Sequence, residues 1–232
     1  MPLNDRIDAA NALLERICSE YAPAVFASSL GAEDMVLTDL IAGKFPDIEI
    51  FTLDTGRLPE ETHRLMQAMG ERYTLKLHVY VPDCKSLEKN IKEHGANSFY
   101  RSVELRKGCC HIRKVEPLKR ALAGKRAWVT GMRRDQALSR TGLSDQAFDE
   151  DNGMEKFNPL IDWTQAEVWE YIRRFEVPYN ELHDRGYPSI GCAPCTCAIT
   201  AGEDVRAGRW WWENPEGKEC GLHERGRAGP PK

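Results

Sequence analysis

Short apolar runs of strand length recur along the chain with helical stretches between them, and this alternation constrains the fold more than any other feature. We predict strands at residues 24–29, 48–54, 75–81 and 126–132. Apolar residues at helical spacing predict helices at residues 4–20, 33–42, 59–72 and 85–94. Strands that alternate with helices form parallel sheets through right-handed crossovers. We therefore expect an α/β fold with a parallel sheet flanked by helices.

Two local signals place helix starts in the second half of the chain. Pro117 lacks the N–H that would donate to the Arg113 carbonyl, so we expect a kink or a new helix start there. Thr164 and Glu167 have the spacing of a capping box, which predicts a helix that continues to about Phe175. Its predicted apolar face consists of Val168, Trp169, Ile172 and Phe175.

The chain is long and apolar enough for one self-sufficient core. It has 232 residues, of which 41% are hydrophobic, and we see no internal repeat. We place an α/β domain at residues 1–202 and a C-terminal segment at residues 203–232, which ends in a Gly- and Pro-rich stretch that predicts a mobile tail. A formal charge of −4 argues against nucleic acid or a membrane surface as the partner.

The cysteines indicate chemistry if the compartment is reducing. The chain has no apolar run of about eighteen residues, and Asp5 and Arg6 lie where a signal peptide has its apolar stretch, so we expect a cytoplasmic protein. Disulfides are rare in that compartment. The eight cysteines therefore predict metal ligands or redox chemistry.

Two polar loops follow predicted strands and indicate a nucleotide pocket. The first, Ser-Ser-Leu-Gly-Ala-Glu-Asp, begins at Ser28 and contains Ser29 and Gly31, whose backbone can approach an anion. The second contains Asp54 and Gly56. Both loops would lie at the carboxyl edge of the sheet, where open α/β sheets bind ligands. The alternative is a pair of ordinary turns, the first with acidic residues that complement a helix dipole.

The strongest chemical signal is a pair of cysteine pairs, Cys109-Cys110 and Cys192-Ala193-Pro194-Cys195. Four thiolates suit a tetrahedral zinc ion or an iron–sulfur cluster. Adjacent side chains on a helix diverge by about 100°, which suits a cluster with separate iron corners better than one small ion. Zinc and unligated cysteines remain the alternatives at this point.

A further cysteine and a set of cations are candidates for catalysis and anion binding. Cys220 is a candidate nucleophile because Lys218 and His223 favour its thiolate, although Glu219 opposes them. An incidental exposed cysteine is the alternative. Arginine binds phosphate and sulfate oxygens bidentately, whereas solvated surface charge is the other interpretation of these cations. The candidate cations are Lys107, Arg113, Lys114, Arg133, Arg134, Arg140, Arg206 and Arg209.

Six motifs in order resemble the assimilatory sulfonucleotide reductases, specifically their iron–sulfur branch, over nearly the whole chain. The motifs are SSLGAED, LDTGR, CCHIRK followed by EPL, TGMRRDQ, GCAPC, and GEDVRAGRWWWE followed by KECGLH. The resemblance implies a Rossmann-like fold of the adenine nucleotide α-hydrolase type. It also implies a [4Fe–4S] cluster on Cys109, Cys110, Cys192 and Cys195.

The implied reaction converts adenosine 5′-phosphosulfate (APS) and reduced thioredoxin, or glutaredoxin, into sulfite, AMP and oxidised reductant. Cys220 would attack the sulfo group and become S-sulfonated. Enzymes for the 3′-phosphorylated substrate (PAPS) typically lack the cysteine pairs, which favours APS. The implied substrate-binding residues are Ser28, Ser29, Gly31, Asp54, Gly56, Lys114, Arg134, Arg140, Arg206 and Arg209. A homo-oligomer remains open.

Three positions depart from the family pattern, and three other functions remain as alternatives. Ala137 replaces a common serine, Cys197 replaces a common arginine, and His111 lies at a variable position. The first alternative is a PAPS or dual-substrate reductase. The second, an ATP pyrophosphatase or RNA thiolase, is disfavoured because Leu30 replaces a loop glycine. The third is a zinc-stapled nucleotide-binding regulator without catalysis.

Overall fold

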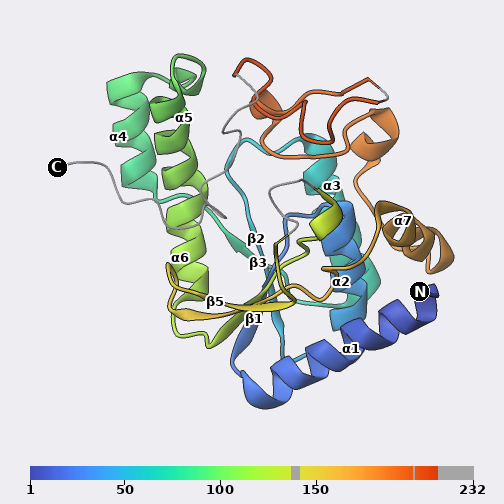
Figure 1. Cartoon of the computed structure of the whole chain (residues 1–232). Coiled ribbons are helices and arrows are strands. Elements are labelled where there is room, and N and C mark those ends of the chain that lie inside the picture. The colour runs from blue at the N-terminus through green and yellow to red at the C-terminus, as the bar shows by residue number, and fades with distance from the viewer. Residues whose placement is uncertain (137–141, 201, 214–232) are drawn as a thin grey trace.

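The computed structural model describes residues 1–136, 142–200 and 202–213, and within them the sheet order is β3-β2-β1-β4-β6-β5 (Figure 1). All neighbouring strands pair in parallel except β5 and β6, which are antiparallel. The predicted α/β fold with a mainly parallel sheet is therefore confirmed. The strands are β1 (Ala24–Ala27), β2 (Glu49–Leu53), β3 (His78–Tyr80), β4 (Ala127–Val129), β5 (Gln146–Asp149) and β6 (Met154–Phe157).

Helices cover both faces of the sheet. Figure 1 shows α4, α5 and α6 on one side and α2, α3 and α7 on the other, with α1 along the lower edge in that view. No helix among the described residues is long and apolar enough to cross a membrane. The α-helices are α1 (Leu3–Glu20), α2 (Ala32–Lys44), α3 (Glu60–Tyr73), α4 (Cys84–His94), α5 (Val103–Cys110), α6 (Glu116–Leu122) and α7 (Gln165–Arg174).

The strand residues alternate between two apolar cores. In β1, Phe26 packs into a large cluster with side chains of α1, α2, α3 and α7, whereas its neighbour Val25 packs into a smaller cluster under α6. Successive side chains of a strand point to opposite faces, so a strand buried on both faces is apolar throughout. This explains why the central strands appear in the sequence as uninterrupted apolar runs.

The helix that carries the tandem cysteines changes from α-helical to π-helical and back to α-helical. The α-helix α5 ends at Cys110, a π-helical turn covers His111–Val115, and α6 starts at Glu116 with Pro117 in its first turn. The prediction of a helix start at Pro117 is therefore confirmed. The π-helical turn directly precedes the proline, and its wider hydrogen bonds, such as that from the Glu116 N–H to the His111 carbonyl, join the two α-helices.

Two expectations about local structure need correction. The hairpin of β5 and β6 was not predicted, because half of its strand residues, Gln146–Asp149 and Met154–Phe157, are polar and the strands lack the uninterrupted apolar run of a buried strand. The predicted apolar face of α7 was wrong at Phe175, which is 36% exposed, whereas Tyr171 is buried. Tyr171 is buried together with its hydroxyl because that hydroxyl donates to Asp39 Oδ2 at 2.7 Å.

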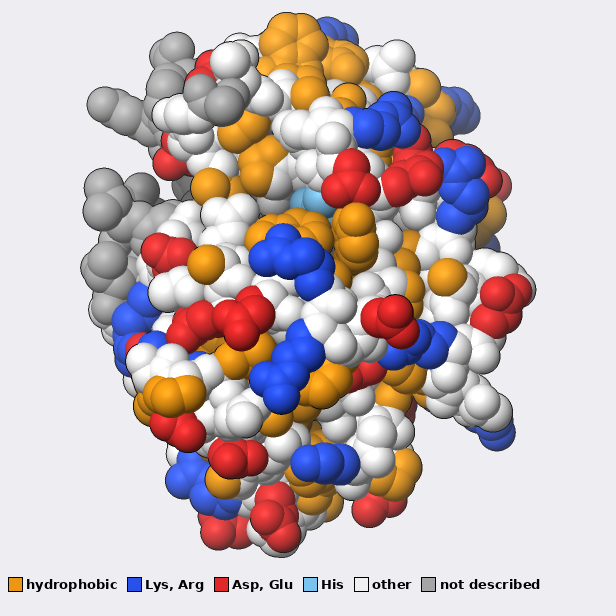
Figure 2. Space-filling view, turned by 90° about the vertical axis from the view of Figure 1, so that its right-hand side faces the viewer, with side chains coloured by type: hydrophobic (Ala, Val, Ile, Leu, Met, Phe, Trp, Pro, Cys, Tyr) orange, Lys and Arg blue, Asp and Glu red, His pale blue; other side chains and the backbone are white. Residues whose placement is uncertain are grey.

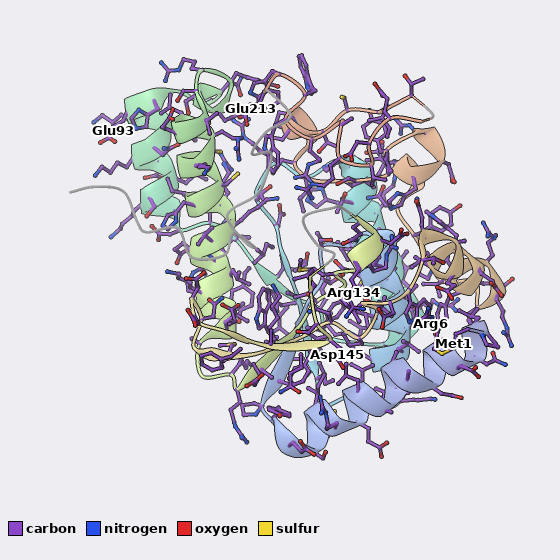
Figure 3. All side chains as sticks on the ribbon, in the orientation of Figure 1. Met1, Arg6, Glu93, Arg134, Asp145 and Glu213 are labelled. Atoms are coloured by element: carbon purple, nitrogen blue, oxygen red, sulfur yellow. The ribbon has the colours of Figure 1, made fainter. Side chains whose placement is uncertain are left out.

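The capping box that starts α7 is present and gives a test of local stability. Thr164 Oγ1 accepts from the Glu167 N–H at 3.2 Å, and Glu167 Oε2 accepts from the Thr164 N–H at 2.7 Å. Glu167 also pairs at 3.3 Å with Arg6 of α1, which Figure 3 labels beside α7.

We expect Thr164→Ala to lower the free energy of unfolding by about 1 kcal/mol, because the helix loses its N-cap. Thr164→Ser keeps the hydroxyl and should remain close to the native value. Urea denaturation of the three proteins measures the difference. Equal midpoints for the alanine and serine variants would show that the cap contributes nothing.

Candidate functional site

A cavity of about 260 Å³ opens at the carboxyl ends of β1, β2 and β4. The loops that follow β1 and β4 form two of its walls, and the segment before the second cysteine pair forms a third. It is the kind of crevice in which α/β sheets bind nucleotides. The predicted site residues that line it are Ser28, Ser29, Gly31, Lys114, Arg206 and Arg209.

The loop after β1 is held by its own hydrogen bonds. The Ser28 N–H donates to the Phe51 carbonyl at 2.8 Å, which ties the loop to β2. Leu30 adopts a left-handed backbone conformation, with φ of 62°, in which a glycine is usually found. Its side chain is 1% exposed and belongs to the large core, so apolar burial offsets the backbone strain.

The Asp34 carboxylate fastens this loop to the loop after β4. Asp34 Oδ2 accepts from both the N–H and the hydroxyl of Ser29, each at 2.6 Å. A further backbone hydrogen bond reaches Asp34 from Gly131, and a Cβ at Gly131 would lie only 2.1 Å from Asp34 Oδ1. Burial raises the pKa of Asp34 to about 6, against the opposing effect of these hydrogen bonds.

The cavity contains a buried cation that no carboxylate of the described residues neutralises. Arg209 is 8% exposed and forms no ion pair with any described residue. Its Nη1 makes only long contacts, to Ser189 Oγ at 3.4 Å and the Ile190 carbonyl at 3.5 Å. A buried, uncompensated guanidinium is costly unless an anion joins it. Arg133, in contrast, pairs with Glu33 at 2.8 Å in the same wall.

Several predicted site residues do not line the cavity. Asp54 accepts from the Gly56 N–H at 2.8 Å and contacts His63 Nε2 at 3.2 Å. Its carboxylate therefore stabilises the turn that contains it. Arg134, labelled in Figure 3, forms an ion pair with Asp162 and lines a separate, shallower cavity. Arg140 and Cys220 lie outside the described residues, as does most of the segment at 203–232. Roles for these residues stay predictions.

Three of the four predicted ligand cysteines lie within electrostatic range of one another. The pKa of Cys195 is raised to about 12, first by burial and then by Cys192 and Cys109. Burial also raises the pKa of Cys109. Cys192 is buried, with its Sγ 3.2 Å from the Thr55 hydroxyl, and Cys110 directly follows Cys109 at the end of α5. Burial thus favours the protonated thiol at Cys109 and Cys195 unless a metal displaces the proton.

The surroundings of these cysteines fit an anionic metal cluster. Arg113 and Arg57 interact with Cys109, and Lys114 and Arg209 interact with Cys195, so cations face the thiols on two sides. Two buried donors, Arg209 Nε and Trp210 Nε1, find no acceptor among the described residues. Thiolates with nearby N–H donors are the usual environment of iron–sulfur clusters.

A single metal ion fits less well. No group of three or more His, Cys, Asp or Glu side chains in the part of the chain that the structure describes is close enough for one ion. A cluster binds its thiolates at separate iron atoms and so accepts a wider arrangement.

Sequence reasoning missed several residues of the site. Asp34 was interpreted only as a complement to the helix dipole, because nothing in a linear sequence shows the loop after β4 approaching it. Thr55, Gly131 and Trp210 were likewise not assigned. His183 lines the cavity, and burial lowers its pKa. The sequence signal for the turn at Thr55 was a polar residue directly before a loop glycine, Gly56.

Comparisons with known proteins agree on one family. Residues 23–198 match the model of the phosphoadenosine phosphosulfate reductase domain. The adenosine 5′-phosphosulfate reductase of Allochromatium vinosum is 56% identical over 96% of this chain and 87% of its own length. That of Burkholderia cepacia is 54% identical, over 94% of this chain and 87% of its own.

Solved structures show the same architecture. The phosphoadenylyl-sulfate reductase of Candida auris, in a phosphate complex, superposes with a TM-score of 0.71 and 31% identity, covering 81% of this chain and 90% of that chain. An FMN adenylyltransferase of Candida glabrata superposes with a TM-score of 0.60 at 16% identity, covering 87% of this chain and 66% of that chain. The second likeness shows the fold alone.

We expect Asp34→Asn to weaken AMP binding by roughly tenfold, because the amide presents a donor to loop N–H groups that need an acceptor. Asp39→Asn is the matched control on the same helix, since Asp39 accepts from Tyr73 and Tyr171. Titration calorimetry measures both. A loss of AMP affinity in the control as large as in Asp34→Asn would contradict a specific role for Asp34.

The same pair of proteins tests the raised pKa. As the pH falls through about 6, native Asp34 gains a proton and loses an acceptor site, so the native protein should lose affinity that the asparagine variant does not lose. The AMP phosphate also titrates near this pH, so the difference between the two profiles is the informative quantity. Parallel profiles from pH 5 to 8 would place the pKa of Asp34 outside this range.

Proposed function

Because the chain belongs to the phosphoadenosine phosphosulfate reductase family, we propose that it reduces adenosine 5′-phosphosulfate to sulfite and AMP. The observation that carries this proposal is the cavity at the carboxyl edge of the sheet, where Lys114 and Arg209 both line the nucleotide space and interact with Cys195. An anionic substrate there would lie next to the cysteine pairs. The relatives at 56% and 54% identity are named for the same substrate.

The cysteine pairs favour APS over PAPS. We propose that Cys109, Cys110, Cys192 and Cys195 hold a [4Fe–4S] cluster, which fits one buried and three half-buried cysteines with cations nearby. When bound, the cluster supplies an electrostatic and organising element beside the substrate rather than a path for electrons. A PAPS or dual-substrate reductase is the second candidate, because the Candida auris structure is a PAPS reductase.

Covalent catalysis by Cys220 accounts for the electrons. Its thiolate attacks the sulfur of the phosphosulfate, an S–S bond forms, the S–O bond breaks, and AMP leaves with the electron pair of that bond. A thiolate of reduced thioredoxin, or glutaredoxin, then attacks Cys220 Sγ and releases sulfite with the S–S electron pair. The second reductant thiol resolves the mixed disulfide and returns the Cys220 thiolate. The dithiol of the reductant thus supplies both electrons.

The lining of the cavity stabilises the charge that develops on AMP. The N–H groups of Ser28 and Ser29 are bonded to the Phe51 carbonyl and to Asp34, so this loop would bind the phosphate through the start of α2 at Gly31. The cations Lys114, Arg206 and Arg209 line the space for the anhydride. Fixed donors are effective because they need no rearrangement when the bond breaks. Asp54, Gly56, Arg134 and Arg140 lie farther from this centre or outside the described residues, so their roles in binding remain the least supported.

The cellular setting follows from the chemistry. Sulfite production from APS belongs to assimilatory sulfate reduction toward cysteine, with thioredoxin as partner in the cytoplasm. Figure 2 shows acidic and basic side chains interspersed on the face in view, with no continuous basic patch there. That mixture fits a small-molecule substrate rather than nucleic acid. A homo-oligomer remains compatible with the exposed aromatic residues Trp211 and Tyr100.

Incubation with APS under anaerobic conditions, without thioredoxin, should add the mass of one sulfo group to the native protein. Intact mass spectrometry measures the adduct, and Cys220→Ser should carry none, because the serine hydroxyl is a far weaker nucleophile than a thiolate. PAPS in parallel tests specificity. An adduct with both substrates would support the dual-substrate enzyme, and an adduct with neither would contradict the proposed function.

Cys192→Ser should lose nearly all bound iron and sulfide, whereas Cys197→Ser should retain them. Both substitutions remove one thiol from the same loop, so they form a matched pair. Chemical iron and sulfide analysis of anaerobically purified protein measures the effect. Full iron content in Cys192→Ser would contradict the ligand set, and an iron-free variant with full turnover would contradict the organising role.

A further inference from the structure

We infer that Arg106 is a positioning residue that places the cavity cation Arg209 through the Trp210 ring, which both guanidinium groups contact. Arg106 does not line the cavity, and its position on α5 is one turn before Cys109. The inference rests on the proposed function, because it takes Arg209 as the cation that receives an anionic group of the nucleotide.

Arg106 is among the most deeply buried side chains of the molecule, at 1% exposure. Its Nε donates to Glu213 Oε1 at 2.7 Å, and Glu213 is 10% exposed, so the ion pair is shielded from water. Figure 3 shows Glu213 beside the upper end of α5. The Arg106 guanidinium carbon lies 4.4 Å from the centroid of the Trp210 ring, within the range of a cation–π contact.

The same ring supports Arg209. The Arg209 guanidinium carbon lies 4.9 Å from the Trp210 centroid. On another side the guanidinium is bounded by Gly191, where a Cβ would lie only 2.5 Å from Arg209 Nη2. The Trp210 ring and the Gly191 backbone thus leave this cation little freedom to move within the cavity.

The backbone of Trp210 is strained, so contacts from other side chains are needed to fix the position of its ring. Its φ is 44°, a left-handed conformation that a bulky residue rarely adopts. The Trp210 N–H donates to the Cys195 carbonyl at 3.1 Å, which fixes the backbone but not the ring. Among the described residues, Arg106 and Arg209 supply the cation–π contacts of that ring. Trp210 is 1% exposed, so removing Arg106 leaves space beside a buried ring, into which the ring and the Arg209 guanidinium against it can shift.

This arrangement predicts a selective loss of binding. Arg209 faces the anionic part of a nucleotide, so a misplaced Arg209 should weaken the binding of AMP but not of adenosine. A merely structural role for Arg106 would affect both ligands alike. The comparison of the two ligands therefore separates positioning from general destabilisation.

The experiment measures the dissociation constants of AMP and adenosine by titration calorimetry for the native full-length protein, Arg106→Met, Arg209→Met and the double variant. We expect Arg106→Met to weaken AMP binding by about tenfold and to leave adenosine binding unchanged. In the double variant the loss should equal that of Arg209→Met alone, because residues that act through one another are not additive.

Arg16→Met is the control, since it removes a cation–π contact with Phe157 at 5.8 Å outside the cavity. It should bind both ligands as the native protein does. If Arg106→Met fails to fold because Glu213 is left unpaired, Arg106→Met with Glu213→Gln takes its place, with the same expected selectivity.

Three results would overturn the inference: unchanged AMP affinity in the Arg106 variants, equal losses for AMP and adenosine, or additive losses in the double variant. A native protein that binds AMP but gains no sulfo adduct from APS would contradict the proposed reaction and leave the positioning role intact. A native protein that does not bind AMP would overturn both.

Discussion

The carboxylate of Asp34 joins the two loops on which the cavity depends. It accepts from the N–H and hydroxyl of Ser29 after β1, and its other oxygen touches Gly131 after β4. Strand pairing places these loops side by side, but it does not fix their separation beyond the sheet edge. A short carboxylate that is buried between them does, and only a glycine at position 131 leaves room for it. This contact has a cost, because burial raises the pKa of Asp34 to about 6 and so disfavours the charged form that the loops require. Such costs are common at sites of function.

The frame of the molecule could be predicted from the sequence because its signals are local. A capping box needs only Thr164 and Glu167, a helix start needs only Pro117, and each central strand is apolar because both its faces are covered. The hairpin of β5 and β6 escaped prediction because an edge strand carries polar residues, and its place in the sheet depends on pairing with β4. Tyr171, and not the predicted Phe175, is buried at α7, because Asp39 accepts a hydrogen bond from the Tyr171 hydroxyl. Asp39 is more than a hundred residues away in the sequence.

The candidate site was only partly predictable, for the opposite reason. The cysteine pairs and the cations Lys114 and Arg209 were identified by residue type and by resemblance, and the structure brings them together from distant segments. Asp54 and Arg134 are also charged residues, yet Asp54 contacts His63 and Arg134 forms an ion pair with Asp162. A charged residue is available to a ligand only if no oppositely charged side chain lies close enough to pair with it. That proximity is a property of the tertiary structure. Arg133 and Arg209 illustrate it within one cavity, since Glu33 neutralises only the former.

Lys114 and Arg209 link the two halves of the site energetically. Both line the nucleotide cavity, and both lower the pKa of Cys195, so the same two cations face the substrate and the cysteine pairs. Two anionic groups that share cations weaken each other's binding, because each attracts the same positive charge and repels the other. A site of this kind tolerates a fully charged substrate only if additional donors support one of the groups. Two such donors are Arg209 Nε and Trp210 Nε1, which are buried and find no acceptor among the described residues. The cations beside Cys195 thus supply local positive charge in a protein whose formal net charge is −4.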